Sequence, residues 1–406
     1  MLRQSNQTGT TRILGLVCAA VLCSILVAGL WPFHAPQNDV TWLVGSRGLH
    51  FGHYGTILSS RTFRLTRGED EPARSLEIWL TPGSVWETPS TLLAFYAPED
   101  AEHFSLHQAY EALVLETGVE TQPHQLGRVR LLLDHVFHQR GSVFVTIASG
   151  PQRTAVWVNG SLVQSTSPFP LTLTGSLVVG NSPVTVDRWR GDLQGLAIYN
   201  SELTQEQILS HYKTWTTMGR PQVTENDRTF ALYLFDEGHG RIVHDGAGSG
   251  IDLYIPQHYM VLNEKLLEPF WKEFSWGRPY WSAVLLNVAG FVPLGFFFCA
   301  YFESVRQIKR AALATIILGL AVSLVIETLQ GFLPTRDSGT TDVITNTVGT
   351  CLGTALYLGT VARVLPVRVR PQSLRDSGMI CVDSQSSRPV PLGRFSRLRK
   401  NRLGLS

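Results

Sequence analysis

Long apolar segments constrain this chain more than any other feature, because a helix needs about 20 apolar residues to cross a bilayer. We predict membrane-spanning helices over residues 13–31, about 280–302, 311–333 and 343–362. Trp31, Tyr280 and Trp281 flank these segments, as is typical of helix ends at a membrane–water interface. The sequence therefore predicts an α-helical membrane protein with four spans.

The first apolar segment, residues 13–31, has two interpretations. A cleaved signal peptide is one, but the segment is long for that role and no convincing small-x-small site follows it. No lipobox precedes Cys18 or Cys23. We therefore expect an uncleaved anchor that follows a cytoplasmic stub of residues 1–12.

Basic residues are distributed unevenly around the apolar segments. Residues 363–406 contain nine arginines and one lysine against two acidic residues, a charge of 10 − 2 = +8, so the rest of the chain carries 2 − 8 = −6. The stub and the connection between the second and third spans are also basic. Because Lys and Arg favour the cytoplasmic side of a membrane, we expect both termini in the cytoplasm. Residues 32–279 and 334–342 are then expected outside.

The basic tail, residues 363–406, is rich in Arg, Ser, Pro and Gly, which predicts a disordered end that also acts as a topology signal. Contact with anionic lipid head groups is an alternative. The opposite charges of the two parts of the chain indicate different compartments, and we predict no nucleic-acid partner.

Residues 40–256 contain short apolar or alternating runs separated by Gly, Pro, Asn and Ser, which predict an all-β sandwich or barrel. Asn159-Gly160 lies between AVWV and SLV and predicts a two-residue hairpin. A short helix is expected in SELTQEQILSHYKTW, with Ser201 or Thr204 as its N-cap. No cysteine lies between residues 24 and 298, so this region has neither a disulfide nor a thiolate metal site.

The end of this region resembles a known fold family. The run GSLVVGNSPVTVDRWRGDLQGLAIYNSELTQEQILSHY, with VWVNGSLV before it, is similar to the closing part of a laminin-G-like, concanavalin A-like jelly roll. Residues 231–256 resemble the strand that opens such a domain, although here they follow its end. We prefer a circular permutation to a truncated second copy, because a lone strand has an unpaired edge and cannot bury a core. The resemblance implies a jelly-roll sandwich over residues 40–256.

Fold alone does not define the function of such a sandwich, since the family includes lectins, glucanases and adhesion modules. The glucanase-type E-x-D-x-E pattern, which would place two carboxylates at catalytic distance, is absent. Sugar binding would use exposed aromatic rings, and the tryptophans available are Trp42, Trp79, Trp86, Trp157 and Trp189. Core positions are the simpler interpretation of each. Asp236, Asp245 and Asp252 are candidates for Ca²⁺ binding or for surface turns, and no other cofactor is predicted.

A polar side chain inside a membrane-spanning helix costs free energy, so its presence suggests a functional role. Glu327 and Gln330 are three residues apart, so they share one helix face. Asp342 and Asn346 share a face of the next helix. Because only a short turn separates these helices, we expect their polar ends to meet near the outer leaflet, together with Arg336 and Asn287.

The same residues carry a second resemblance. Three blocks occur in order: Asn287, Phe291, Pro293 and Gly295; then Glu327, Gln330 and Arg336; then Asp342, Asn346, Gly349 and Gly353. Their spacing resembles that of the VanZ-like family of multi-pass bacterial membrane proteins, over about residues 280–362. The resemblance implies a place in the bacterial cytoplasmic membrane and a role in the envelope, linked to teicoplanin-type antibiotic resistance, but no defined reaction. VanZ-like domains often have one more preceding span, and here the sandwich separates the first span from the other three as an insertion.

Three interpretations of the VanZ-like polar cluster remain open. In the first it is a scaffold, where Arg336 pairs with Glu327 or Asp342 and the amides bond between helices. In the second it binds a lipid-linked or polar envelope ligand. In the third it is an intramembrane catalytic site with an acid and a base but no nucleophile–base pair.

The leading hypothesis for the whole chain is a non-catalytic envelope membrane protein whose sandwich binds a glycan, a glycopeptide or a protein. The alternative is an intramembrane enzyme or a lipid-handling protein that uses Glu327, Arg336 and Asp342. The helix-packing residues are expected to be Pro293, Gly295, Gly349 and Gly353. Residues 258–278 are predicted to form a juxtamembrane amphipathic stretch.

Overall fold

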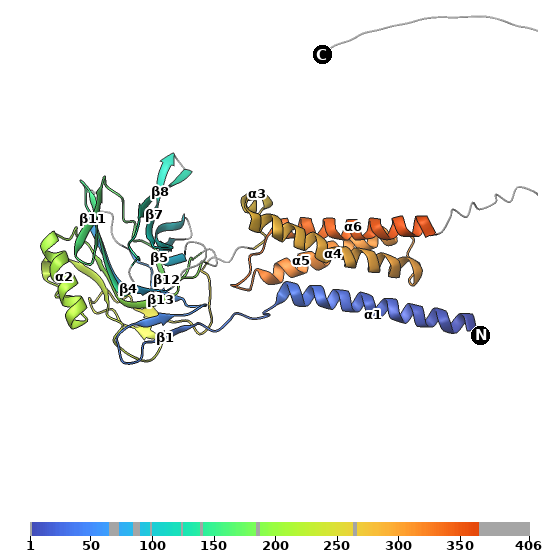
Figure 1. The fold of residues 1–406 in the computed structure, drawn as a ribbon, viewed down its shortest axis with the longest axis horizontal. Helices are drawn as coiled ribbons and strands as arrows, with labels where there is room; N and C mark the ends of the chain where they lie inside the picture. The colour runs from blue at the N-terminus through green and yellow to red at the C-terminus, as the bar shows by residue number, and fades with distance from the viewer. Residues whose placement is uncertain are drawn as a thin grey trace, which may run out of the picture. The chain divides into compact units, whose positions relative to one another are not determined.

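The computed structural model describes residues 2–64, 73–83, 90–97, 100–122, 125–138, 141–183, 187–262 and 266–364. These residues form a β-sandwich and a set of long helices (Figure 1). The predicted combination of an all-β sandwich with an α-helical membrane region is confirmed in class. Trp86 and the basic tail from residue 365 onward lie outside the described residues.

Two antiparallel sheets form the sandwich. The first sheet contains, in spatial order, β1 (Val40–Trp42), β2 (Leu49–Phe51), β13 (Gly191–Tyr199), β4 (Arg74–Pro82), β9 (Val143–Ser149), β10 (Thr154–Val158) and β11 (Ser161–Thr166), with β14 (Thr229–Tyr233) paired to β13. The second contains β15 (Ile242–Val243), β16 (Leu253–Tyr254), β3 (Ile57–Ser59), β12 (Ser176–Val179), β5 (Ser90–Ala97), β6 (Asp100–Ala109), β7 (Ala112–Gln122) and β8 (Gln125–Leu133).

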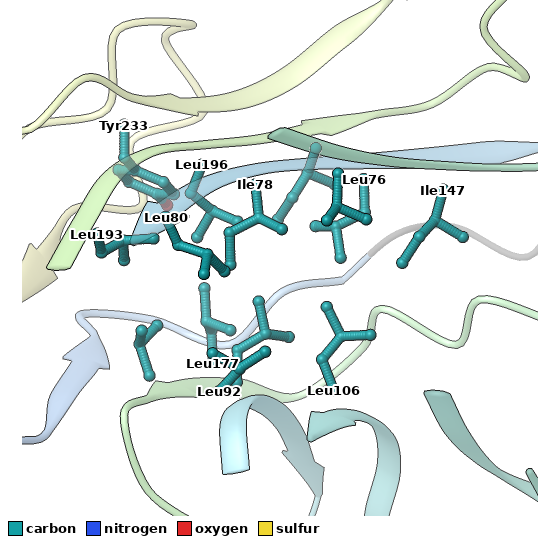
Figure 2. Close-up of a cluster of buried hydrophobic side chains, with 14 of the residues drawn as sticks. Leu76, Ile78, Leu80, Leu92, Leu106, Ile147, Leu177, Leu193, Leu196 and Tyr233 are labelled. Carbon is teal, nitrogen blue, oxygen red and sulfur yellow. The ribbon is translucent and has the colours of Figure 1, made fainter. Parts of the chain in front are cut away.

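Alternating apolar residues of the two sheets meet in one core. Leu76, Ile78 and Leu80 of β4 are fully buried, because the period of two along a strand turns them all to the same face. Figure 2 shows them opposite Leu92 and Leu106 of the other sheet. This shared core is what holds the two sheets together.

The segment that follows the jelly-roll end belongs to the same sandwich. β14 pairs with β13 in the first sheet, whereas β16 pairs with β3 in the second. Residues 229–254 therefore add strands to both existing sheets. Tyr233 of β14 is fully buried, and its hydroxyl donates to the Ile251 carbonyl at 2.6 Å.

The local signals for turns and for the short helix are confirmed. Asn159 and Gly160 have φ of 50° and 74°, the left-handed values that a tight β10–β11 hairpin requires. Helix α2 (Gln205–Met218) begins after Thr204, which forms a capping box with Gln207. The N-cap is thus Thr204, whereas the hydroxyl of Ser201 donates to the Asp227 carbonyl at 2.6 Å.

Outside the sandwich, the described residues form five helices: α1 (Leu2–Leu30), α3 (Phe270–Glu273), α4 (Arg278–Ser304), α5 (Ala311–Gln330) and α6 (Thr340–Val364). By length and composition, three segments of the described residues are able to cross a membrane: Thr11–Leu30, α4 and α5. Helix α6 has 25 residues but is rich in Thr and Gly and is not among these three. The fourth span therefore stays a prediction.

Helix α1 packs against α4 and α5, although the whole sandwich separates them in the chain. Val21, Leu22 and Ile25 of α1 contact a small buried cluster that includes Phe291 of α4 and Ile326 of α5. The thiol of Cys18 also donates to the Phe297 carbonyl at 3.4 Å. Helix α1 is therefore a structural member of the helix bundle.

Candidate functional site

The centre of the VanZ-like cluster is Glu327, near the end of α5. Its side chain is buried, and Oε2 accepts a hydrogen bond of 2.9 Å from the Gly339 backbone N–H. Its backbone carbonyl accepts a bond of 2.7 Å from the Ser338 hydroxyl. Because one residue binds the turn through both its side chain and its backbone, Glu327 fixes the connection between α5 and α6.

A second carboxylate, Glu273 of α3, comes from the juxtamembrane stretch. Its Oε2 accepts hydrogen bonds from the backbone N–H and the hydroxyl of Thr341, at 3.0 and 2.5 Å. These groups lie in the first turn of α6, where free backbone N–H groups favour an anion. Residue-by-residue motif analysis missed Glu273, and the available signal was an acid within the aromatic run EPFWKEF.

The same stretch pairs with the α5–α6 turn through its backbone. Glu268 forms a parallel bridge with Gly339. Its N–H donates to the Ser338 carbonyl and its carbonyl accepts from Thr340 N–H, both at 2.9 Å. The chain that leads from the sandwich into α4 is therefore attached to the turn that carries the cluster.

Asp342 and Asn346 lie one helical turn apart on α6. Asn287 of α4 interacts with the Asp342 carboxylate. The amide nitrogen of Asn346 donates to the Ser323 hydroxyl of α5 at 2.9 Å, while its buried Oδ1 has no hydrogen-bond partner. Ser323 is one turn before Glu327, so a second polar pair lies one turn deeper in the bundle than the carboxylates.

Gln330 and Arg336 face helix α1 instead. The Arg336 guanidinium donates from Nε and Nη2 to the Trp31 carbonyl at 3.1 and 2.7 Å. The Gln330 amide donates to the Gly29 carbonyl at 2.8 Å. Among the described residues, Arg336 therefore does not form the ion pair with Glu327 or Asp342 that the scaffold interpretation included. The last carbonyls of a helix lack partners within the helix and carry partial negative charge, so they attract the cation.

Three glycines set the contact between α4 and α6. A Cβ on Gly349 would overlap the Val288 carbonyl, and a Cβ on Gly353 would overlap the Val292 carbonyl. On α4, a Cβ on Gly295 would overlap the Thr350 carbonyl. The two backbones thus approach as closely as a G-x-x-x-G face permits. Pro293 lies inside α4 between these contacts.

The assembled cluster is acidic. Glu273, Glu327 and Asp342 act on one another electrostatically, and none of the three forms an ion pair with a described Lys or Arg. Within the described part of the chain, no group of three or more His, Cys, Asp or Glu is placed to hold a metal ion. Chemically, the site offers carboxylate and amide acceptors to a donor such as a hydroxyl or ammonium group.

Four of the sandwich residues singled out for calcium or sugar binding have hydrogen-bond partners or core positions. Asp245 accepts backbone hydrogen bonds from Leu232 and Ala247, both at 2.9 Å, and Asp252 accepts from Asp245 N–H at 3.0 Å. Trp157 and Trp189 are buried. The geometry of these residues is that of surface turns and of core positions.

A buried charged network in the sandwich had escaped motif analysis. His211 of α2 lies between two carboxylates, with Nδ1 at 3.2 Å from Glu77 Oε2 and Nε2 at 3.5 Å from Asp227 Oδ2. The Tyr199 hydroxyl donates to Glu77 at 2.6 Å. Burial opposes the charged imidazole, but the hydrogen bonds and charges of Glu77 and Asp227 outweigh it and raise the pKa of His211. The only sequence signal was an acid inside the apolar strand SLEIWL.

Family models match two separate parts of the chain. Residues 240–363 match the VanZ/LLP1 model, and residues 64–209 match that of the concanavalin A-like lectin/glucanases superfamily. Both resemblances seen in the sequence are thereby confirmed. The chain combines a VanZ-like region with a concanavalin A-like domain, which supports a membrane protein that carries a binding domain.

The solved structures similar to this chain include carbohydrate-binding and receptor-binding proteins. A candidate carbohydrate-binding protein from Bacteroides ovatus is 12% identical, with 52% of this chain and 58% of that chain covered and a TM-score of 0.34. The receptor-binding domain of botulinum neurotoxin D is 14% identical, with 55% and 74% covered and a TM-score of 0.35. The CBM40 module of the Ruminococcus gnavus IT-sialidase, bound to α2,3-sialyllactose, is 12% identical, with 37% and 95% covered and a TM-score of 0.29. The chain thus spans little more than half of the first of these, and no curated protein matches it.

Proposed function

We propose that this protein is a multi-pass bacterial envelope protein that presents its sandwich outside the cytoplasmic membrane to bind a glycan, a glycopeptide or a protein. The bundle anchors this binding module, and both termini lie in the cytoplasm. The observation that carries the proposal is that both connections to the sandwich leave the bundle at one end.

Two contacts define that end. Arg336 donates to the carbonyl of Trp31, which directly follows α1. Glu268, which precedes α4 in the chain, forms a bridge with Gly339. Arg336 and Gly339 belong to the same α5–α6 connection. At the other end, a Cβ on Gly15 of α1 would lie 3.6 Å from the Tyr301 ring of α4. The basic residues after α4 lie there, and they favour the cytoplasmic side.

The test is a binding screen of the full-length protein in nanodiscs against envelope polysaccharides, peptidoglycan fragments and glycopeptides. We expect binding that is lost when residues 40–256 are deleted and the bundle alone is reconstituted. An absence of binding to every cell-wall or polysaccharide ligand would count against the proposal. Teicoplanin susceptibility of a host with and without the gene tests the link to resistance.

A second candidate function is the handling of a lipid-linked ligand or an intramembrane reaction at the acidic cluster. It is favoured by a buried Glu327 inside an apolar helix and by the unpartnered Oδ1 of Asn346 one turn deeper. Glu327→Gln keeps an oxygen acceptor for Gly339. Loss of an envelope phenotype at unchanged melting temperature would support this candidate, whereas a lowered melting temperature would indicate a scaffold.

A further inference from the structure

The outer face of the second sheet carries an exposed pair of arginines. Arg128 and Arg130 of β8 both bind Glu116 of β7, Arg128 at 2.9 Å from Oε1 and Arg130 at Oε2. The Glu116 side chain is 7% exposed, but those of Arg128 and Arg130 are 54% and 67% exposed. Burial would raise the pKa of Glu116, but the two arginines outweigh it and lower the pKa. Two exposed guanidinium groups therefore share one buried carboxylate, and one positive charge is left over.

Polar side chains continue from this pair across the neighbouring strands. Ser105 of β6 is in register with Glu116, and its hydroxyl lies 2.8 Å from His107 Nε2. The other ring nitrogen of His107 lies 3.1 Å from the Thr91 hydroxyl of β5, which donates to Asp187 at 2.8 Å. Ser105 and Thr91 are buried, so they form a satisfied polar floor between the exposed groups.

A second pair of arginines lies at the far end of this floor. Arg188 forms a bridge with Thr91, so it adjoins β5. The ring of His53 lies between the two guanidinium groups, with Arg188 Nη1 at 2.7 Å from Nε2 and Arg190 beside Nδ1, and a neutral imidazole accepts a hydrogen bond from only one of them. Arg188 also lies 4.8 Å from the centre of the Tyr54 ring. Two guanidinium groups that converge on one imidazole repel each other, and an anion placed between them would relieve that repulsion.

The spacing of the two pairs sets the size of the ligand. Neighbouring strands lie about 4.8 Å apart, so the three steps from β8 to β5 and the fourth from β5 to the segment of Arg188 span about 19 Å. A single small anion cannot contact both pairs. A chain with anionic groups at intervals can, because each arginine pair presents forked donors that match carboxylate or phosphate oxygens.

From this arrangement we infer that the sandwich binds an anionic envelope polymer, with carboxylate or phosphate groups, along Arg128, Arg130, Arg188 and Arg190. The inference rests on the proposed function, because it names the ligand class of the binding module. It also predicts that affinity falls with salt, since the contacts are exposed and ionic.

The experiment uses the full-length protein in nanodiscs of uncharged lipids. Binding is measured to polygalacturonate, to poly(glycerol phosphate) and to neutral dextran, at low and high salt. For the wild type we expect binding to at least one charged polymer, weakened at high salt, and none to dextran. A preference for one charged polymer identifies carboxylate or phosphate as the recognised group.

Variants localise the site. Arg188→Gln/Arg190→Gln and Arg128→Gln should each weaken binding at least tenfold, and Arg128→Gln leaves Arg130 on Glu116 so that the carboxylate stays paired. The matched control is Arg153→Gln/Arg220→Gln, which changes two exposed arginines outside the proposed site. This control variant should bind as the wild type does. Unchanged tryptophan fluorescence and melting temperature show that each variant is folded.

The outcomes separate this inference from the proposed function. Binding to neutral glycans or to a protein, with no binding to charged polymers, overturns the inference and leaves the proposed function standing. An equal loss of polymer binding in the variants of the proposed site and in the control variant also overturns the inference. Failure to bind any ligand in either screen counts against both.

Discussion

At the scale of single residues, the sandwich contains a buried ionic network in which His211 lies between Glu77 and Asp227. All three side chains are buried, and Tyr199 stacks on the imidazole at 5.5 Å between ring centres. A buried pair contributes little over an apolar replacement, but removal of one partner leaves an uncompensated charge. This network attaches α2 to the outer face of the first sheet.

The first prediction concerns pH. The raised pKa of His211 means that its contribution to stability is complete below the unfolded value of about 6.5 and is lost as pH rises through the folded pKa. We therefore expect a melting temperature that falls as pH rises above about 6.5. The readout is tryptophan fluorescence, since Trp215 of α2 is fully buried.

The second prediction concerns removal of the imidazole. His211→Leu leaves two buried carboxylates without their cation and should lower the free energy of unfolding by about 3–5 kcal/mol. It should also remove the part of the pH dependence that comes from the imidazole. His239→Asn, at an exposed histidine, is the control and should change neither. A variant as stable as the wild type at pH 6 would contradict the role assigned to the network.

At the scale of elements, the close contact between α4 and α6 depends on glycine residues. We predict that Gly353→Leu, which places a side chain against the Val292 carbonyl, separates the two helices and lowers the melting temperature in detergent. The cost of such overpacking is about 1–3 kcal/mol or more. Gly359→Ala is the matched control, because its Cβ would meet nothing within 4 Å. Equal melting temperatures of the two variants would show that α6 does not pack on α4 in this way.

Helix α1 is the element whose place the sequence alone leaves least defined. A Cβ on Gly29 would lie 2.9 Å from Ile326 of α5. We predict that Gly29→Cys/Ile326→Cys forms an intramolecular disulfide in a cysteine-free background, since a side chain on Gly29 would contact that of residue 326. Val27→Cys/Ile326→Cys is the control, because Val27 is exposed. Mass spectrometry detects the bond, and its absence under oxidising conditions would argue that α1 lies elsewhere.

At the scale of the whole molecule, the sandwich is an insertion into the helix bundle, between α1 and α4. The proposed topology predicts that a cysteine at His239 reacts with a membrane-impermeant thiol reagent in intact spheroplasts. A cysteine at Lys309 should react only after permeabilisation. Labelling of both positions without permeabilisation would exclude the proposed arrangement.

Short-range pattern was enough to predict the sandwich, the α2 helix, the Asn159-Gly160 turn and three apolar helices, because strand alternation, capping and apolar length depend on neighbours in the chain. The sequence motifs also selected Glu327, Arg336 and Asp342, but not their partners. Arg336 binds the end of α1, and Glu273 and His211 became visible only in three dimensions. A side chain takes whichever unsatisfied donor or acceptor the fold brings near it, and segments hundreds of residues apart supply those groups. Tertiary structure alone therefore decided the contacts by which the first helix joins the bundle, whereas the basic residues had already predicted that both links to the sandwich lie on one side of the membrane.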